Sequence, residues 1–377
     1  MPLLRQSAQW IVVLVERGKS RGTRASRAER MCLPIVRVII VNYNCARLAM
    51  DCARSVLKCS SNGGAIAVTI VENGSTDDSR EVLNVLLGPP CRSGDIRWID
   101  AQENRGFGAG CNAGFADALN GGQAPDFWWL INPDAHAVPG CLDSLLSVMN
   151  KNPAAGIVGG GLIDWSGRAM AACGQDPTAL VELVVTSQVP SLMDRYSRGI
   201  PEQQCSADWV CGANMLLRAR ALEQVIGFDE GFFLYYEDLD LCRRVRNTGW
   251  RVIHEPAARV VHSVGKSTQI PLIGRWPGYF FESRCRYFLK HSGKWGLVKA
   301  DVAWTLGWLV RRIRRWWDLG RTIAQFPKRF ASDLLLTDLK SLARQCPPPT
   351  SGILPKARER RQFARNIRQT VNRPTSP

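Results

Sequence analysis

The sequence predicts an α/β protein with a mostly parallel, doubly wound sheet, and three observations support this prediction. The first 150 of its 377 residues alternate β-branched runs with helical stretches, which is typical of a parallel sheet covered by helices. Polar residues follow the ends of successive predicted strands. The composition, 45% hydrophobic and 22% charged, is that of a globular protein with one large core or two moderate ones.

The strands of the first half are continuous apolar runs, as expected for strands buried on both faces. The first reads VRVIIVNYN, and a helical stretch follows it through Lys58. The second and third read AIAVTIVE and IRWIDA, and the glycine-rich run NRGFGAGCNAGF opens the next helix. The fourth strand, FWWLINPD, must break before a helix predicted from Pro139 to Asn150, because Pro133 and Pro139 oppose a helix between them.

In the second half of the sequence, the predicted alternation of strands and helices is less regular. From Ala155 to about Asp208 we expect only short strands and polar loop. A strand, a short helix, a helix from about Tyr236 to Thr248 and two further β runs follow, and after Gly265 the chain becomes aromatic and basic. The predicted organisation is a leader over 1–33, either disordered or preceding a true start at Met31, then a catalytic-sized domain over 34–270, an amphipathic helical extension over 271–345 and a disordered basic tail over 346–377.

Charge and cysteine usage narrow the function classes. The net charge of +16 is uneven, with −5 over 31–270 and +16 over 271–377. An acidic body without a recognised binding motif argues against a nucleic-acid partner, so a nucleic-acid binder acting through the basic tail is the weaker alternative. The thirteen cysteines include no C-x-x-C pair, which disfavours zinc and fits a reducing compartment. No apolar run reaches the length of a membrane span.

Four polar clusters, at 42–44, 72–75, 104–110 and 132–134, fall at the carboxyl edge of the predicted sheet. In open α/β sheets this edge binds ligands, and four clusters in succession indicate a nucleotide-shaped crevice. Glu72 is suited to accept a hydrogen bond from a pyrimidine base, and Arg105 with Gly106 suits a diphosphate. Asp134 is suited to hold Mg²⁺ or Mn²⁺, although taken alone it reads as a turn residue capping the helix near Pro139.

A second carboxylate group lies in YYEDLDLCRR. Glu237, Asp238 and Asp240 fall in the first turn of a predicted helix, where the helix dipole favours acids that pair with Arg243 or Arg244. The functional interpretation is that one of these acids is a general base. His262 ends an apolar run, where a lone histidine is usually structural but becomes a credible ligand beside a metal.

Six motifs follow one another in order between Val36 and Lys294: VIIVNYN, VENGSTDDS, ENRGFGAGCNAGF, WWLINPDA, GFDEGFFLYYEDLDLCRRVRNTGWRV and PAARVVHSVGKS. With these motifs the chain resembles family 2 glycosyltransferases of the GT-A fold, and most closely their rhamnosyltransferase-like branch. The resemblance implies inverting transfer from a nucleotide-sugar without a covalent intermediate. Asp134 matches the last Asp of the family's D-x-D, with Asn132 in place of the first Asp, and His262 matches a metal-side His. Asp238 matches the base, and Glu72 replaces the usual Asp at the base-reading position.

We accordingly expect an enzyme that moves a sugar, with L-rhamnose from dTDP-rhamnose as the best guess, to a lipid-linked or polysaccharide acceptor. A UDP-hexose donor is the alternative, whereas a nucleotidyltransferase is disfavoured because the first strand lacks a lysine-containing glycine-rich loop. The oligomeric state stays open. The predicted residues are Asp238 and Glu237 for catalysis, Asp134 and His262 for Mg²⁺ or Mn²⁺, Asn42, Asn44, Glu72, Asn73, Arg105, Gly106, Asn112 and Asn132 for the nucleotide-sugar, and Trp209, Gly212, Tyr236 and Asp240 for the acceptor.

The extension is predicted to dock the enzyme on a membrane surface, on the cytoplasmic face of the plasma membrane. It is rich in tryptophan and then in arginine, with Trp304, Trp308, Trp316 and Trp317 beside Arg311, Arg312, Arg314 and Arg315. Tryptophan suits the headgroup boundary, and arginine suits anionic lipid. The alternative is a helical cap packed on the catalytic domain with solvated arginines.

Overall fold

The structure is a computed structural model that describes residues 34–59, 65–89, 95–120, 124–196, 200–263, 275–317, 326–327 and 329–344. The predicted leader and the predicted basic tail lie outside the described residues.

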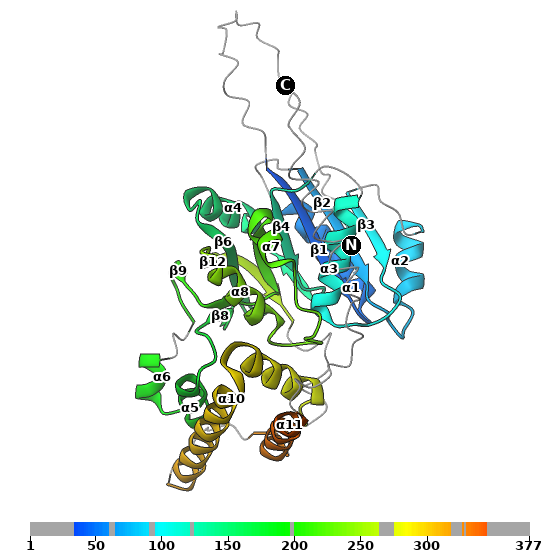
Figure 1. Cartoon of the computed structure of the whole chain (residues 1–377). Coiled ribbons are helices and arrows are strands. Elements are labelled where there is room, and N and C mark those ends of the chain that lie inside the picture. Colours follow the sequence, from blue (N-terminus) through cyan, green and yellow to red (C-terminus); the bar gives the residue numbers. More distant parts are fainter. Residues whose placement is uncertain are drawn as a thin grey trace, which may run out of the picture. The chain divides into compact units, whose positions relative to one another are not determined.

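A mixed sheet forms the centre of the protein, in the order β3-β2-β1-β4-β11-β6-β12-β5. The pairs β3-β2, β2-β1, β1-β4 and β6-β12 are parallel, whereas β11 runs antiparallel between β4 and β6. The predicted mostly parallel sheet is confirmed (Figure 1). Its strands are β1 (Ile35–Asn42), β2 (Ala65–Glu72), β3 (Ile96–Asp100), β4 (Phe127–Ile131), β5 (Ala135–Ala137), β6 (Ala155–Ile163), β11 (Asn214–Arg218) and β12 (Arg251–His262).

The β-branched run of β1 is buried on both faces, as the sequence predicts. Val38 and Ile40 pack into one core cluster, and Ile39 and Val41 pack into the other. Successive side chains of a strand point to opposite faces, so one apolar run contributes to both cores. The helices that pack on the two faces of the sheet are α1 (Ala46–Lys58), α2 (Ser79–Leu87), α3 (Phe107–Asn120), α4 (Cys141–Lys151), α7 (Ala219–Val225) and α8 (Glu237–Asn247).

Residues 155–208 are more regular than the sequence predicts. β6 is a nine-residue strand, buried along nearly its whole length, and α5 (Ala179–Ser187) and α6 (Pro190–Tyr196) lie where polar loop was expected. The glycines of AGIVGGGLI concealed the strand, because they weaken strand propensity. They serve close packing instead: a Cβ at Gly159 would lie 2.3 Å from Val210, and one at Gly160 would lie 2.0 Å from Asn214.

Short strands complete this part of the chain. β7 (Ala169–Met170) pairs with β6, β9 (Cys205–Ser206) pairs with β12, and β8 (Cys173–Gly174) pairs with β10 (Trp209–Val210). The two β runs predicted after α8 are one strand, β12, whose register shifts between Glu255 and Arg259. This irregularity explains why the sequence resembled two strands.

The extension is helical, as predicted. α10 (Gly278–Trp317) is broken at Gly293, where φ is 68° and ψ is −173°, and α11 (Phe330–Arg344) packs against it. Figure 1 shows these helices, yellow to orange, together with α5 at the lower end of the view. Among the described residues, no helix combines the length and apolar character needed to cross a bilayer.

Candidate active site

The carboxyl ends of β1 and β2 bring the first two polar clusters together. Asn42 lies opposite Glu72 in the parallel register, and its Nδ2 donates to Glu72 Oε2 at 2.5 Å. The other carboxylate oxygen accepts the backbone N–H of Ser75 at 2.5 Å. Glu72 is fully buried, so in this structure both of its oxygens serve the protein, and base reading by Glu72 stays a prediction. Asn42 Oδ1 is buried and has no hydrogen-bond partner.

The third cluster joins the same edge through Asn73. Asn73 Nδ2 donates to Asn104 Oδ1 at 3.3 Å and to the Gly106 carbonyl at 3.2 Å. Gly106 has a φ of 97°, and a Cβ there would lie 2.1 Å from the Phe233 carbonyl. Only glycine therefore fits where the loop before α8 crosses the start of α3. Asn44 fixes the neighbouring turn, because its Oδ1 accepts the Thr76 N–H at 2.8 Å.

Arg105 and Asn112 lie together but face a protein partner. Arg105 Nη2 is 2.6 Å from Glu230 Oε2, and Asn112 Nδ2 donates to Glu230 Oε1 at 2.9 Å. Asn112 also accepts the Phe228 N–H at 2.9 Å. The loop over 228–233 is thus fastened to α3 by residues that the sequence assigned to the donor. Sequence reasoning missed Glu230, although its loop stood inside a recognised motif.

The fourth cluster holds the predicted metal ligands. His262 ends β12, which pairs with β5, and its Nε2 lies 3.1 Å from Asp134 Oδ1. Asn132 Nδ2 is 3.2 Å from the same ring nitrogen. Asp134 is buried, and its Oδ1 makes no hydrogen bond. A buried carboxylate oxygen without a hydrogen bond is costly, so this atom fits a cation.

The donor set is small for a metal. Within the described ranges, no three His, Cys, Asp or Glu residues gather closely enough to hold an ion. Asp134 and His262 therefore supply two protein ligands at most. This fits a cation such as Mg²⁺ or Mn²⁺, because Mg²⁺ is usually bound through one or two carboxylates plus substrate phosphates and water.

The predicted catalytic acids begin α8 after a strained turn. Tyr235 and Tyr236 have φ values of 69° and 64°, in the left-handed region that non-glycine residues rarely adopt. Two such residues in succession, directly before Glu237 and Asp238, place strain where functional sites commonly store it. Glu237 is buried, and its Oε2 has no hydrogen-bond partner.

Burial controls the charge of both acids. It raises the pKa of Asp238 above its ordinary value, although the N–H groups of Gly212 and Leu239 oppose this by donating to the carboxylate at 3.2 and 2.9 Å. Burial, and then the negative charge of Asp238, raise the pKa of Glu237 well above its ordinary value. A carboxyl group whose pKa is raised is a stronger proton acceptor, as a general base requires.

One turn links the two carboxylate groups. The Gly212 N–H donates to Asp238, and the next residue, Ala213, accepts the Asn132 N–H at 3.3 Å. The thiol of Cys211, beside this turn, is influenced by acids of both groups. Its pKa is raised to about 12, first by burial and then by the negative charges of Asp238, Glu237 and Asp134. The predicted base and Asn132, two residues before the predicted metal ligand Asp134, therefore bond to one short segment, which sequence reasoning did not single out as a meeting point.

The remaining predicted acceptor residues are placed differently. Gly212 lies directly beside Asp238, whereas Trp209 Nε1 donates to the Gln175 carbonyl at 2.8 Å. The Tyr236 ring packs against Phe280 with centroids 5.9 Å apart. Asp240 is fully buried, with Arg244 at 2.7 Å, Lys290 at 2.6 Å and His291 at 2.8 Å from its oxygens. Its acceptor role stays a prediction, since these partners hold both oxygens in this structure.

Known proteins are similar to this chain in sequence and in fold. A family model described as "Glycosyltransferase like family 2" matches residues 34–276. The N-acetylglucosaminyl-diphospho-decaprenol L-rhamnosyltransferase of Mycobacterium tuberculosis is 30% identical over 259 residues, which cover 64% of this chain and 80% of that protein. The rhamnosyltransferase WbbL of Escherichia coli is 44% identical over 55 residues, covering 15% of this chain and 21% of that protein.

A solved structure supports the fold. The crystal structure of GalNAc-T7 with UDP, GalNAc and Mn²⁺ aligns with a TM-score of 0.51 at 14% identity, covering 82% of this chain and 58% of that one. This likeness shows a GT-A glycosyltransferase fold and nothing about the substrate. Because the family model covers well over half of the residues and its motifs meet at one edge of the sheet, this chain belongs to family 2 of the glycosyltransferases.

Proposed function

We propose that this glycosyltransferase works by inversion, with Asp238 as the general base. The observation that carries the proposal is that Asp238 and Asn132, which lies two residues before Asp134, both bond to the turn at Gly212 and Ala213. The acceptor hydroxyl attacks the anomeric carbon on the face opposite the leaving nucleotide diphosphate. Asp238 takes the hydroxyl proton as the new bond forms, and burial, which raises the pKa of Asp238, makes this carboxylate a stronger proton acceptor than an exposed one.

The donor would lie along the carboxyl ends of β1 to β4. Asn42 Oδ1 offers a buried acceptor without a partner, and the asparagines at 44, 73 and 132 shape the surrounding turns. Asp134 and His262 would hold a divalent cation, which supplies positive charge to the departing diphosphate. Arg105 would reach the diphosphate only after leaving Glu230, so we infer that donor binding breaks this ion pair.

For the donor we propose dTDP-L-rhamnose, because the two relatives named above are rhamnosyltransferases. A UDP-hexose is the alternative donor. For the acceptor we propose a lipid-linked sugar, since the mycobacterial relative is named for a decaprenol-linked one.

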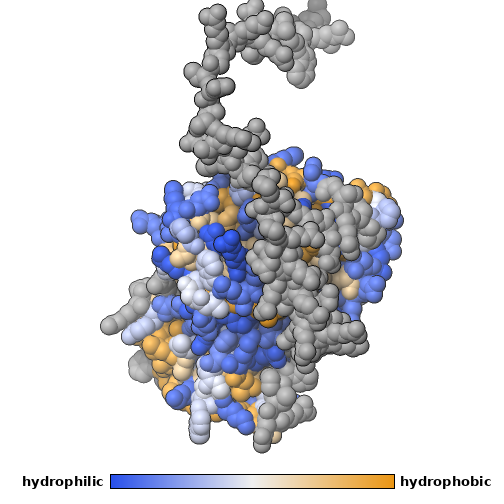
Figure 2. All heavy atoms as spheres, turned by 45° about the horizontal axis from the view of Figure 1, so that its top comes forward, coloured by the Kyte–Doolittle hydropathy of each residue, from blue (hydrophilic) through white to orange (hydrophobic). Residues whose placement is uncertain are grey.

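We also propose that the enzyme sits on the inner face of the plasma membrane through α10. Five apolar residues spaced by four and three positions share one face of this helix and are 43% to 80% exposed: Val302, Leu306, Leu309, Ile313 and Trp316. Figure 2 shows hydrophobic residues exposed at the lower end of the molecule, where Figure 1 places the extension. Exposed Arg312 and Arg315 beside this stripe complement anionic lipid.

A donor panel with the purified full chain tests the proposed reaction. We expect release of nucleotide diphosphate from dTDP-L-rhamnose in the presence of a lipid-linked acceptor sugar, and loss of release in excess EDTA. Turnover of a UDP-hexose alone would select the alternative donor. Turnover that survives EDTA would remove the metal from the proposal, and no turnover of any nucleotide-sugar would reject the proposed donor class.

A further inference from the structure

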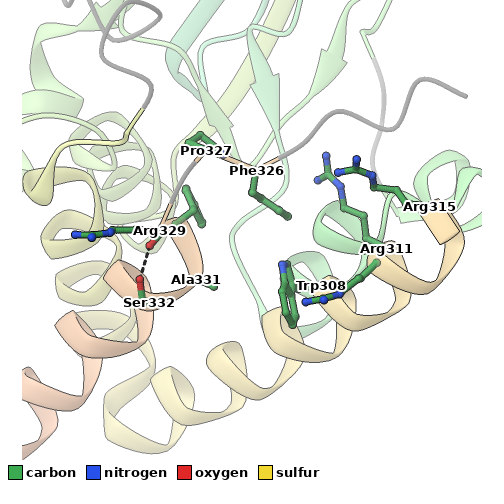
Figure 3. Close-up of a pocket in the computed structure, with 10 residues that line it drawn as sticks. Trp308, Arg311, Arg315, Phe326, Pro327, Arg329, Ala331 and Ser332 are labelled. Carbon is green, nitrogen blue, oxygen red and sulfur yellow. Dashed lines mark hydrogen bonds between the residues drawn. The ribbon is translucent and has the colours of Figure 1, made fainter. Parts of the chain in front are cut away.

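The extension contains a cavity of about 580 Å³ between α10 and the segment that leads into α11. Arg311, Arg312 and Arg315 line one side together with Trp308. Phe326, Pro327 and the first turn of α11 line the other side. Figure 3 shows Arg311 and Arg315 rising from α10 with their guanidinium groups toward the side of Phe326. The cavity thus combines a cationic side with an aromatic one.

Aromatic contacts position these arginines. The Arg311 guanidinium lies 4.3 Å from the centre of the Phe326 ring, and Arg312 lies 5.4 Å from that of Trp308. Arg311 is 7% exposed, whereas Arg312 and Arg315 are exposed at the rim. A stacked guanidinium keeps its in-plane N–H donors available for an anion.

The cavity concentrates positive charge. Burial, and then the charge of Arg315, lower the pKa of Arg311. The positive charges of these two arginines therefore repel each other. In the part of the chain that the structure describes, neither Arg312 nor Arg315 has a carboxylate within ion-pair distance. The nearby Asp333 is held by Arg275, through contacts of 2.8 and 2.6 Å. A bound anion would relieve this repulsion.

Other arginines of the extension show how the fold uses this residue for structure. Arg314, in the same run, donates to the Ser187 carbonyl at 3.1 Å and to the Gln188 carbonyl, which closes the end of α5. Arg284 is buried against Glu182, Asp301 and Asp338. In contrast to these two, Arg312 and Arg315 at the cavity rim have no carboxylate or carbonyl partner among the described residues, so their N–H groups are available to a ligand.

Aromatic contacts also connect the cavity to the loop that precedes α8. Tyr236, which precedes the catalytic acids, packs against Phe280 at 5.9 Å between ring centroids. Phe280 packs against Phe330 at 6.1 Å, and Phe330 packs against Phe326 at 5.1 Å. Phe326 and Phe330 line the cavity, so a continuous aromatic contact runs from the cavity to the start of α8.

We propose that this cavity binds the diphosphate group of the lipid that carries the acceptor sugar. Guanidinium groups match phosphate oxygens through paired hydrogen bonds. The apolar stripe of α10 adjoins the cavity through Arg312 and Arg315, so it provides a surface for the lipid chain. This inference rests on the proposed lipid-linked acceptor and assigns a site to it.

Vesicle flotation of the full chain tests the site. The vesicles are phosphatidylcholine alone, phosphatidylcholine with geranylgeranyl diphosphate, and phosphatidylcholine with phosphatidylglycerol at the same surface charge. The variant is Arg312→Gln with Arg315→Gln, and the matched control is Lys294→Gln with Lys299→Gln, two exposed lysines on the same helix outside the cavity. Melting temperatures confirm that both variants fold.

We expect wild type and control to bind the diphosphate vesicles best, and the arginine variant to lose about tenfold in affinity or more. Equal binding of the arginine variant and the control would overturn the site. Equal binding of wild type to the phosphatidylglycerol and diphosphate vesicles would overturn the diphosphate ligand in favour of general surface charge.

A second readout separates this inference from the proposed function. Calorimetry of dTDP with Mn²⁺ measures the donor site alone, and we expect all three proteins to bind dTDP equally. Normal flotation without dTDP binding would leave the lipid site standing while the proposed donor failed. Normal dTDP binding with unaltered flotation of the arginine variant would reject the lipid site only.

Discussion

The carboxylates that begin α8 and the carboxylate at the contact between α8 and α10 are held in opposite ways. Among the described residues, neither Glu237 nor Asp238 has a lysine or arginine within ion-pair distance, and burial raises the pKa of both. At the contact, Asp240 lies two residues further along the same helix. Burial opposes its ionisation, but His291, Arg244 and Lys290 hold its pKa below the ordinary value.

In the proposed reaction, this difference distinguishes a catalytic acid, Asp238, from a structural acid, Asp240, within one turn of the same helix. A buried charge that the protein neutralises fixes the position of an element, as Asp240 fixes α10 on α8. A buried acid that the protein leaves without a cation is costly and is retained where chemistry requires it. The same reasoning distinguishes Arg284, which is surrounded by acids, from Arg312 and Arg315 of the cavity, which have no acid within ion-pair distance in the described part of the chain.

The largest effect is expected for Asp238→Asn. Removing a positioned general base typically lowers the rate about 10²–10⁴-fold, so kcat should fall by that factor while donor affinity stays nearly unchanged. Steady-state kinetics and calorimetry of dTDP binding measure the two quantities. Near-normal turnover of this variant, together with loss of turnover in Glu237→Gln, would assign the base to Glu237 instead.

Asp240→Asn should act on stability instead of the chemical step. It removes the charge that pairs with Arg244, Lys290 and His291, and breaking a buried ion pair costs about 3–5 kcal/mol. Urea unfolding of the full chain measures this loss. A variant as stable as the wild type, with weakened acceptor binding, would contradict the structural role and favour the acceptor role predicted from the sequence.

Variants of the two predicted metal ligands, Asp134 and His262, test the proposed site at the carboxyl edge of the sheet. Asp134→Ala should abolish the Mn²⁺ dependence of dTDP binding, because its buried Oδ1 makes no hydrogen bond and faces His262, the other predicted ligand. His262→Ala should weaken that dependence less, by about 10–100-fold. Calorimetry with and without Mn²⁺ measures both. Metal-dependent binding that persists in Asp134→Ala would exclude Asp134 from the site.

The sheet edge was predictable because its residues follow strands in a regular order. Parallel strands bring their carboxyl ends to one edge, so Asn42, Glu72 and Asp134 were found from position alone. The partners of these residues were not predictable, since contacts such as Arg105 with Glu230 join positions far apart in the chain. β6 was underestimated because its glycines serve packing contacts that only the fold reveals.

The smallest predicted effect, the pH dependence of stability, tests the comparison most directly. A raised pKa in the folded state means that stability is fully present below the unfolded value, 3.8 for Asp238, and is lost as pH rises through the folded value. Asp238→Asn removes this loss, so the variant should be more stable than the wild type at pH 7 by about 0.5–2 kcal/mol, and the difference should vanish toward pH 3.8.

For Asp240, whose pKa is lowered, the sign reverses: stability is present above 3.8 and is lost as pH falls through the folded value. Asp240→Asn should therefore be destabilised most at neutral pH and approach the wild type in acid. Urea unfolding of both variants and the wild type, from well below pH 3.8 up to about pH 8, gives the two curves. If both variants deviated from the wild type in the same direction, the two acids would be held alike, and the distinction between them would be wrong.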